Sequence, residues 1–371
     1  MRILHSGSQI GLVRPYNCCH MLSEQSSSTK PGHTENGAGP PPLTDADLLE
    51  MYRTMVLSRT LDQRIWQMNR QGRAAIVASA QGHEAAQIGA VRALDPERDR
   101  FYIYYRELTT MLALGITPLE LLLGFLAKEG EPLSGARQFP LHGAIDRDRR
   151  DIVSFSNVVA TQLPQAVGVA LADKMRGEKR VTMAYFGDGA SSMGETHEAM
   201  NFASIHRLPV IFFCENNKYA ISVPISQQMN IESIATRASA YGMPGIEVNG
   251  FDPVAVYEAV GAAADRARSG QGPTLVEAVV ERFLPHTSDD DDTRYRPPED
   301  LEGIRDLDPI PATEKILRAS GALYDALDEE IKSSAQKIVN QATEDAENAP
   351  FPEPHDFYEQ VYAPGSPGDL S

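Results

Sequence analysis

The chain has 371 residues, of which 42% are hydrophobic, so it is long enough for one large α/β domain or two smaller ones. Its formal net charge of −17 argues against nucleic acid or an anionic membrane as the main partner. No apolar run reaches the ~18 residues that a membrane span needs. The three cysteines, Cys18, Cys19 and Cys214, form neither a disulfide framework nor a spaced zinc site, so a reducing compartment is expected.

The N-terminal segment differs in composition from the rest of the chain. The stretch SEQSSSTKPGHTENGAGPPP is polar and rich in Gly, Pro and Ser, so it cannot bury enough surface to fold. The residues before it lack the continuous apolar core of a secretory signal. They contain two arginines and no acid, which resembles the composition of an organelle transit peptide. The alternative is that translation starts at Met21. We therefore predict a disordered tail over residues 1–42, a folded domain over residues 43–371, and a location in the bacterial cytoplasm, with the mitochondrial matrix as the alternative.

Three helices are predicted in the first part of the folded chain. Thr44 is a suitable N-cap for the amphipathic run DADLLEMYRTMVLSRTLDQRIWQMNRQG, and Gly72 ends it. The run QGHEAAQIGAVRAL predicts a second helix. The run PLELLLGFLA predicts a third, with Pro118 in its first turn.

Short apolar runs then alternate with helical patterns. They are DIVSF, RVTMAYF, LPVIFFCE and, later, PTLVEAVVERF. This alternation indicates a parallel sheet flanked by helices. After Pro311 an amphipathic helix is predicted from about Ala312 to Asn348. The aromatic tail PFPEPHDFYEQVYAP follows, and it is expected to pack either on its own domain or on a partner subunit.

The segment from Arg180 to Ser222 carries the clearest chemical signal. It is predicted to form a strand, a glycine turn, a helix, a second strand and a second turn. Ser192 and Glu195 have the spacing of a capping box, which places the start of the helix just after Gly189. Because parallel strands joined by one helix end at the same edge of a sheet, the side chains that follow them should converge there.

The residues that follow the two strands can bind a cation. Asp188 follows the first strand, and Asn216, Asn217 and Tyr219 follow the second. A carboxylate with amide or carbonyl oxygens suits a hard divalent cation, and a helix N-terminus suits phosphate. Taken alone, GDG is usually a turn and ENN a loop, but their joint spacing is more specific. A dinucleotide-binding fold would need G-x-G-x-x-G, from which GDGASSMG departs. The pattern therefore predicts a site for a magnesium-bridged diphosphate.

The segment GDGASSMGETHEAMNFASIHRLPVIFFCENN resembles the thiamine-diphosphate motif, which begins with GDG and ends in NN. From about Thr44 onward, the chain is similar to α subunits of the thiamine-dependent first component of 2-oxo acid dehydrogenase complexes. The similar blocks are QGHEAAQIGA, YYRE, QFPLH, ATQLPQAVGVA and HTSDDDDTRYR. The last block and CENNKYAISVPISQQ resemble the branched-chain type more than the pyruvate type. The resemblance implies the thiamine-diphosphate-binding α/β fold, with a mostly parallel sheet flanked by helices and a C-terminal helix and tail.

The resemblance implies roles for the residues that match the family's motifs. Asp188, Asn217 and the carbonyl of Tyr219 would hold magnesium. A potassium site of some relatives matches Ser156, Thr161 and Gln162. The residues implied to contact thiamine diphosphate are Tyr105, Arg106, Asn157, Val159, Asp188, Gly189, Ala190, Asn217, Tyr219, Arg282 and His286.

Two histidines match catalytic histidines of the family. His142 and His286 would orient the carboxylate of a 2-oxo acid and manage protons around its carbonyl. A lone histidine is more often structural, as we expect for His197 and His206, but His142 and His286 both lie in loops marked by Pro or Gly. The residues implied to contact the substrate are Ile76, Tyr105, Phe139 and His142.

Several positions depart from the family's pattern or stay open. Branched-chain relatives often have a phosphate-binding arginine where this chain has Glu215, so that contact is expected to be absent. Asn157 replaces a serine that contacts the cofactor ring. Ile76 replaces a phenylalanine of the acyl pocket, which leaves the preferred chain length open.

The acidic run Asp289–Asp292 has two interpretations. By itself it is a solvated loop. By resemblance it belongs to a loop at the mouth of the active site that becomes ordered when the cofactor binds. Thr287 and Ser288 lie where some relatives are phosphorylated.

The resemblance implies a thiamine-diphosphate- and magnesium-dependent decarboxylation of a branched-chain 2-oxo acid. The acyl group would pass to a lipoyl group on an acyltransferase component. A β subunit would supply the glutamate that activates the cofactor, in an α2β2 heterotetramer. The alternatives are a pyruvate-specific α subunit and a non-catalytic subunit that only scaffolds a complex.

Overall fold

The structure, a computed structural model, describes residues 39–131, 151–153 and 158–354. By its internal contacts the chain separates into residues 1–33 and 34–371, and every described residue belongs to the second unit. The centre of this unit is a six-stranded sheet in the order β2-β1-β3-β4-β8-β7, with all neighbours parallel. The strands are β1 (Arg100–Tyr102), β2 (Asp151–Val153), β3 (Thr182–Gly187), β4 (Val210–Asn216), β7 (Gly245–Asn249) and β8 (Thr274–Val279), and a separate antiparallel pair is formed by β5 (Tyr219–Ala220) and β6 (Val223–Pro224).

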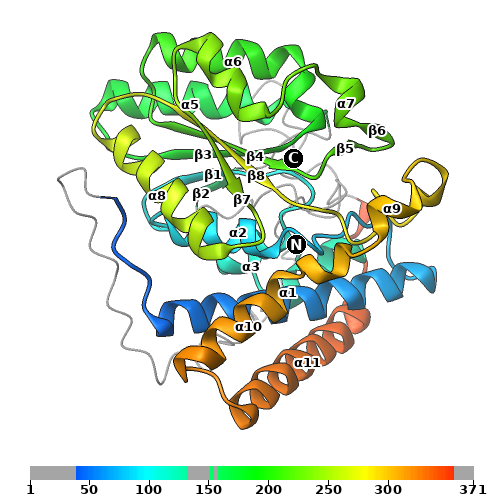
Figure 1. Ribbon diagram of the computed structural model, residues 1–371. Helices are drawn as coiled ribbons and strands as arrows, with labels where there is room; N and C mark the ends of the chain where they lie inside the picture. Colours follow the sequence, from blue (N-terminus) through cyan, green and yellow to red (C-terminus); the bar gives the residue numbers. More distant parts are fainter. Residues whose placement is uncertain (1–38, 132–150, 154–157, 355–371) are drawn as a thin grey trace, which may run out of the picture. The chain divides into compact units, whose positions relative to one another are not determined.

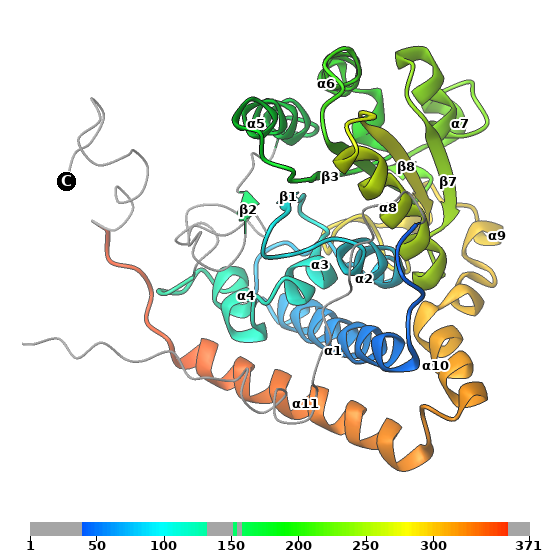
Figure 2. The ribbon, with the colours of Figure 1, turned by 90° about the vertical axis from the view of Figure 1, so that its left-hand side faces the viewer.

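Helices cover both faces of this sheet, as predicted. Figures 1 and 2 show α5 and α6 over one face, and α2 and α8 over the other, with α1 and α11 farther out on that second side. The helices are α1 (Asp45–Arg70), α2 (Glu84–Arg92), α3 (Leu108–Ala113), α4 (Pro118–Phe125), α5 (Gln162–Arg176), α6 (Gly194–Ile205), α7 (Ile225–Gln228), α8 (Pro253–Arg268), α9 (Pro298–Leu301), α10 (Pro309–Ser320) and α11 (Asp325–Asn348).

The central strands are buried on both faces. In β3, Tyr185 belongs to the apolar core shared with α2 and α8, whereas Phe186 belongs to the core shared with α5 and α6. In β4, Phe213 and Phe212 divide in the same way. Alternate side chains of a strand point to opposite faces, so a run that is apolar at every position can fill two cores at once.

The first predicted helix is confirmed at both ends. The Asp47 amide donates to Thr44 Oγ1 (3.2 Å) and the Thr44 amide donates to Asp47 Oδ2 (3.0 Å), which forms a capping box at the start of α1. At the other end, Gly72 has a φ of +71°, a left-handed conformation that a glycine adopts without strain.

The predicted C-terminal helix is two helices. α10 ends at Ser320, and Gly321 takes a φ of +81° before α11 begins at Asp325. The Leu323 amide donates to the carbonyl of Leu317 (3.1 Å), which closes the turn between them. The prediction of one continuous helix from Ala312 was wrong because apolar periodicity continues across a turn that glycine permits.

The predicted capping box after β3 is also wrong. A 3-10 turn covers Gly189–Ser192, and Met193 is extended (φ −80°, ψ 149°) before α6 begins at Gly194. The N-cap of α6 is therefore Met193, and Ser192 lies one residue before the position from which it could cap the helix. Thr196 Oγ1 instead donates to the carbonyl of Ala190 (2.6 Å) and ties α6 to the turn.

Two strands of the sheet were not among the predicted runs. β1 has only three residues, and β7 is an edge strand with no buried residue. A strand this short, or this exposed, carries little apolar signal in a sequence.

The ends of the described chain are packed on the domain. Tyr257 Oη donates to the carbonyl of Pro41 (2.9 Å), so Pro41 contacts α8. Beyond α11, Lys128 Nζ lies 4.1 Å from the centroid of the Phe351 ring and donates to the carbonyl of Ala349 (2.7 Å). The rest of the aromatic tail, residues 355–371, lies outside the described residues. Among the helices that the structure describes, none combines the length and the apolar character needed to cross a membrane.

Candidate functional site

The candidate site lies at the edge of the sheet where β3 and β4 end. The two strands are parallel and in register up to Gly187 and Glu215, so Asp188 and Asn217 emerge side by side. Their side chains are 1% and 6% exposed. The tip of the Asn217 amide is 3.3 Å from Asp188 Oδ1, so the predicted proximity of these two residues is confirmed.

Three oxygen-bearing groups converge at this point. The same tip of the Asn217 amide lies 3.0 Å from the carbonyl oxygen of Tyr219. With its oxygen turned inward, the amide completes a set of carboxylate, amide and carbonyl oxygens, which is a donor set for a hard divalent cation. With its nitrogen turned inward, it donates to both neighbours. Burial raises the pKa of Asp188, and a bound cation would favour its charged form.

A buried arginine, after the neighbouring strand β1, and a histidine lie at the same edge of the sheet. Arg106, which follows β1, is 1% exposed, and its Nη1 donates to the carbonyl of Ser79 (2.7 Å). Its Nη2 donates to the carbonyl of His286 (3.1 Å) and lies 3.2 Å from His286 Nδ1. The ring of Tyr105 meets the His286 ring edge-on at 6.0 Å. Three predicted site residues are therefore in mutual contact.

A second buried arginine has hydrogen-bond donors without partners. Arg282, after β8, is 1% exposed, and its Nη2 donates to the carbonyl of Ile221 (3.0 Å). Within the described residues, Nε and Nη1 of Arg282 have no hydrogen-bond partner. Burial and the neighbouring Arg106 lower the pKa of Arg282. A buried guanidinium with unpaired donors is costly by itself and suits an anionic ligand such as a phosphate group.

His286 is neutral in this environment. Burial lowers its pKa to about 3, and the positive charges of Arg106 and Arg282 act in the same direction. The His286 amide donates to Asp290 Oδ2 (2.9 Å), which holds the residue from its own loop. The imidazole can therefore accept or donate a hydrogen bond without carrying charge.

Comparison with known proteins identifies the family. The family described as the dehydrogenase E1 component matches residues 52–355. The chain belongs to this family. The resemblance inferred from its sequence blocks and the expected thiamine-diphosphate-binding type of α/β fold are thereby confirmed.

Named relatives of this E1 chain span most of its length. It is 47% identical over 321 residues to the 2-oxoisovalerate dehydrogenase subunit alpha of Bacillus subtilis (strain 168), covering 86% of this chain and 97% of that protein. It is 38% identical over 326 residues to the 3-methyl-2-oxobutanoate dehydrogenase subunit alpha of Mycobacterium tuberculosis (strain CDC 1551 / Oshkosh), covering 88% and 85%. It is 36% identical over 332 residues to the pyruvate dehydrogenase E1 component subunit alpha of Bacillus cereus, covering 89% and 86%.

The remaining predicted residues of this E1 chain divide into two groups. Phe139, His142, Ser156 and Asn157 lie outside the described residues. Among the others, Val159 is exposed and Ile76 and Thr161 are half-buried. Gln162 is buried; its Nε2 donates to the carbonyl of Tyr185 (2.9 Å), and its Oε1 has no partner among the described residues.

The acidic run Asp289–Asp292 is only partly solvated. Asp290 accepts from the His286 amide and from Tyr295 Oη. Asp292 is buried, and its Oδ2 lies 3.5 Å from Arg296 Nη1. Ser288 is buried as well and accepts a hydrogen bond from the Val77 amide (3.0 Å). This loop is therefore held to the site by hydrogen bonds and an ion pair.

Sequence reasoning missed a buried polar cluster around Glu215. Glu215, expected only as a missing phosphate contact, is fully buried and accepts from Tyr104 Oη (2.6 Å), while His83 Nδ1 lies 3.0 Å from the same oxygen. Glu107 lies against Glu215. Tyr104 and Glu107 lie in the block YYRE and His83 in QGHEAAQ, but nothing in those blocks shows that they meet.

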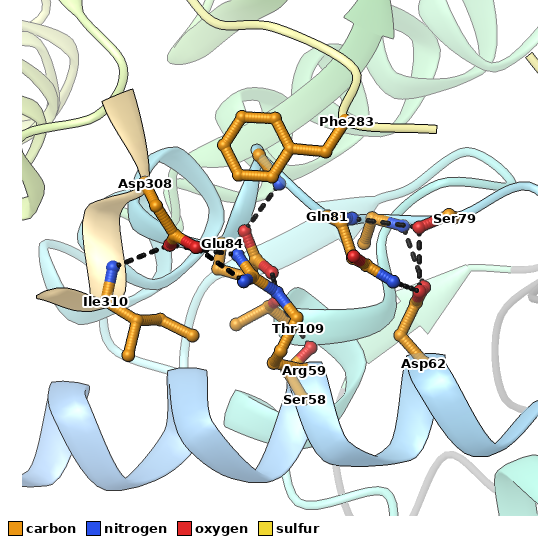
Figure 3. Close-up of polar contacts among 12 residues, drawn as sticks. Ser58, Arg59, Asp62, Ser79, Gln81, Glu84, Thr109, Phe283, Asp308 and Ile310 are labelled. Atoms are coloured by element: carbon orange, nitrogen blue, oxygen red, sulfur yellow. Dashed lines mark hydrogen bonds and ion pairs between the residues drawn. The ribbon is translucent and has the colours of Figure 1, made fainter. Parts of the chain in front are cut away.

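A second missed network joins α1 to the loop of residues 79–82. Asp62 on α1 is 2% exposed and accepts hydrogen bonds from Ser79, Ala80 and Gln81 (Figure 3). Asp62 lies in a run that the sequence assigns to an amphipathic helix, where an acid is expected to face solvent. The signal was its spacing, seven residues after Met55 and three before Ile65, which places it on the apolar side of that helix.

Proposed function

We propose that this chain is the α subunit of a 3-methyl-2-oxobutanoate dehydrogenase that transfers the 2-methylpropanoyl group to a lipoyl group. Membership of the E1 dehydrogenase family implies dependence on thiamine diphosphate. The higher identity to the relative named for 2-oxoisovalerate than to the relative named for pyruvate supports a branched-chain 2-oxo acid as the substrate. The bacterial origin of these relatives supports the bacterial cytoplasm as its location.

One observation carries the cofactor assignment. The oxygens of Asp188, Asn217 and Tyr219 converge at one edge of the sheet, where the unpaired donors of Arg282 also lie buried. A cation site beside buried guanidinium donors is the pairing that a magnesium-bridged diphosphate requires. The residues present therefore fit thiamine diphosphate with Mg²⁺. The unpaired Gln162 Oε1 is available for the potassium ion implied by resemblance.

In this proposal, bound thiamine diphosphate supplies the nucleophile and the electron sink for decarboxylation. Arg106 and Arg282 would offset the charge of the phosphates, and Asp188, Asn217 and the Tyr219 carbonyl would hold the cation. Arg106 and Tyr105 position neutral His286, which would form a hydrogen bond to the reacting group or transfer a proton to or from it. The second catalytic histidine would be His142.

Two further partners belong to the proposal. A β subunit would complete the site in an α2β2 heterotetramer and supply the activating glutamate. A lipoyl-bearing acyltransferase would accept the acyl group. Support comes from the subunit names of the relatives, each of which is called an alpha subunit.

The substrate assignment is tested by co-expressing this chain with its β subunit and comparing the decarboxylation of 3-methyl-2-oxobutanoate with that of pyruvate. We expect kcat/KM to favour the branched acid by at least about tenfold, the order of discrimination that one or two methyl groups provide. A preference for pyruvate would instead assign the chain to the pyruvate type. Absence of activity with every 2-oxo acid, with cofactor bound, would favour a scaffolding subunit.

The cofactor assignment is tested with Asp188→Ala. We expect this variant to abolish magnesium-dependent binding of thiamine diphosphate to the α2β2 complex, because one of three cation ligands and its charge are lost. Isothermal titration calorimetry measures the binding directly. Glu258→Ala, which removes an exposed acid of α8, is the matched control and should bind as the wild type does. Unchanged magnesium dependence in Asp188→Ala would refute the metal site.

A further inference from the structure

We propose that Asp62 is a positioning residue for the anion site. Asp62 holds the loop of residues 79–82, and this loop positions the two buried arginines, Arg106 and Arg282, to bind a diphosphate. This inference rests on the proposed function, but it concerns a residue on α1, a helix that contributes no group to the cofactor.

Asp62 holds the loop by three hydrogen bonds. It accepts from Ser79 Oγ (2.7 Å), from the Ala80 amide (2.9 Å) and from Gln81 Nε2 (2.8 Å). Figure 3 shows the side chains of Ser79 and Gln81 pointing toward its carboxylate. All three partners are donors, and an ionised carboxylate is the side chain that accepts without donating. Asp62 is 2% exposed, and hydrogen bonds to a charged group are stronger in such a buried place than at the surface.

The other side of the loop contacts both arginine segments. The Ser79 carbonyl accepts from Arg106 Nη1 (2.7 Å), and the Gln81 carbonyl accepts from the amide of Phe283 (3.2 Å), the residue after Arg282. Gly82 has a φ of +95°, and a Cβ there would lie 2.0 Å from the carbonyl oxygen of Glu281. The loop therefore lies in direct contact with the chain on both sides of Arg282, and a shift of the loop would move both guanidinium groups.

A second anchor on α1 holds the same loop. Glu84 Oε2 accepts from the Gly82 amide (2.7 Å), and Glu84 Oε1 pairs with Arg59 Nε (2.5 Å). Arg59 also donates to Asp308 Oδ2 (2.7 Å), so its position is held from two sides (Figure 3). Arg59 and Asp62 are three residues apart and lie on one face of α1. The loop is thus held at both ends by a rigid helix, which preorganises the backbone that Arg106 uses as an acceptor.

The competing explanation is that Asp62 only stabilises the fold. A structural role would lower the thermal midpoint of the complex and leave the affinity of the folded protein unchanged. A positioning role changes the affinity for the anion, and it does so for inorganic diphosphate as well as for thiamine diphosphate, because both would use the same two arginines.

The test uses the α2β2 complex freed of cofactor and the variant Asp62→Asn. Isothermal titration calorimetry measures the Kd for inorganic diphosphate and for thiamine diphosphate, each with magnesium. We expect both Kd values to rise about tenfold, equivalent to roughly 1.4 kcal/mol, and kcat at saturating thiamine diphosphate to stay within about twofold. Tyr52→Phe is the matched control: it removes another buried hydrogen bond of α1, to Asp328 Oδ1 (2.8 Å), and should leave both Kd values unchanged.

A milder variant covers the case in which Asp62→Asn does not fold. Ser79→Ala removes one of the three hydrogen bonds and keeps the carbonyl that Arg106 uses; we expect a rise in both Kd values of about threefold. If the wild type binds and the folded variants bind just as tightly while their thermal midpoints fall, the positioning role is refuted and the proposed function stands. If the wild-type complex binds neither ligand, the proposed function fails and this inference fails with it.

Discussion

At the scale of single residues, the charge state of His286 depends on its burial and on two neighbouring arginines. Burial and the two guanidinium groups of Arg106 and Arg282 lower its pKa to about 3, from a usual value of 6.5. In the unfolded chain the imidazole would regain its usual pKa. Between these two values the unfolded state binds more protons than the folded state, so the free energy of unfolding must fall as the pH drops through this window.

We therefore predict that acid destabilises the cofactor-free complex partly through His286. In His286→Asn, the thermal midpoint should fall less steeply between pH 6.5 and pH 5 than in the wild type, since ~1.4 kcal/mol per pH unit is the most that one such group contributes. Added magnesium and thiamine diphosphate should make the pH dependence of the thermal midpoint more alike in variant and wild type, because the phosphate charge offsets both arginines. Parallel pH profiles of variant and wild type would count against a neutral His286.

Another residue-scale feature is the buried contact between Glu107 and Glu215. Burial, and then the charge of Glu215, raise the pKa of Glu107 well above its usual range. Glu215 already accepts from Tyr104 and lies within hydrogen-bond distance of His83. Burial and the charge of Glu215 therefore favour the protonated form of Glu107.

This assignment predicts a smaller loss of folding stability for Glu107→Gln than for Glu215→Gln. Glu107→Gln should leave the free energy of unfolding within about 1 kcal/mol of the wild type, because the amide is as uncharged as the protonated acid that it replaces. Glu215→Gln should cost about 1–3 kcal/mol, because its donors lose a charged acceptor. Urea denaturation of the two complexes compares them, and equal losses in both variants would contradict the assignment.

At the scale of elements, β3 and β4 bring Asp188 and Asn217 together, and the close approach of the turn after β3 to β5 adds the Tyr219 carbonyl. A Cβ at Gly189 would lie 2.8 Å from the Cβ of Ala220, next to the carbonyl of Tyr219. The close approach explains a glycine there without any need for a positive φ. The distance between the turn and β5 therefore sets how near the Tyr219 carbonyl comes to Asp188.

We predict that Gly189→Ala weakens cofactor binding. The added methyl group should push β5 away from Asp188 and raise the magnesium concentration required for thiamine diphosphate binding by about tenfold or more. Gly194→Ala is the matched control, since a Cβ at that position meets no atom within 4 Å. It should bind as the wild type does. Equal magnesium requirements in both variants would show that the turn tolerates the displacement.

At the scale of the whole molecule, the single chain leaves apolar side chains exposed around the candidate site. Val158 and Val159 precede α5 and are 57% and 42% exposed. Ile221, in the turn between β5 and β6, and Val223, which begins β6, are 56% and 41% exposed. Decarboxylation on a bound cofactor benefits from the exclusion of water, which a surface open in this way does not provide. This exposure agrees with a proposed partner subunit that closes the site.

We predict that the purified single chain decarboxylates 3-methyl-2-oxobutanoate at below roughly 1% of the rate of the α2β2 complex, because a missing acid–base group alone costs that much or more. Adding the separately purified β subunit should restore the rate. Steady-state release of carbon dioxide measures it. Full activity of the single chain would exclude an essential glutamate on the partner.

The sequence by itself determined the parts of this protein that are local. Helix α1 with its Thr44 cap, the buried runs of β3 and β4, and the Asp188–Asn217 pair were all predictable, because apolar periodicity and the geometry of a strand–helix–strand unit act over short stretches. The edge strand β7 was not, because it carries little apolar signal, and the break at Gly321 was not, because the apolar pattern continues across it.

Only the tertiary structure decided how distant residues combine. Asp62 and Ser79 are close in sequence but on different elements, and Arg282 reaches the site from a strand late in the chain. Glu215 looked like a lost phosphate contact, yet it is the buried acceptor of Tyr104. Burial and partner choice depend on which surfaces pack together, and a run of residues does not contain that information before the chain folds.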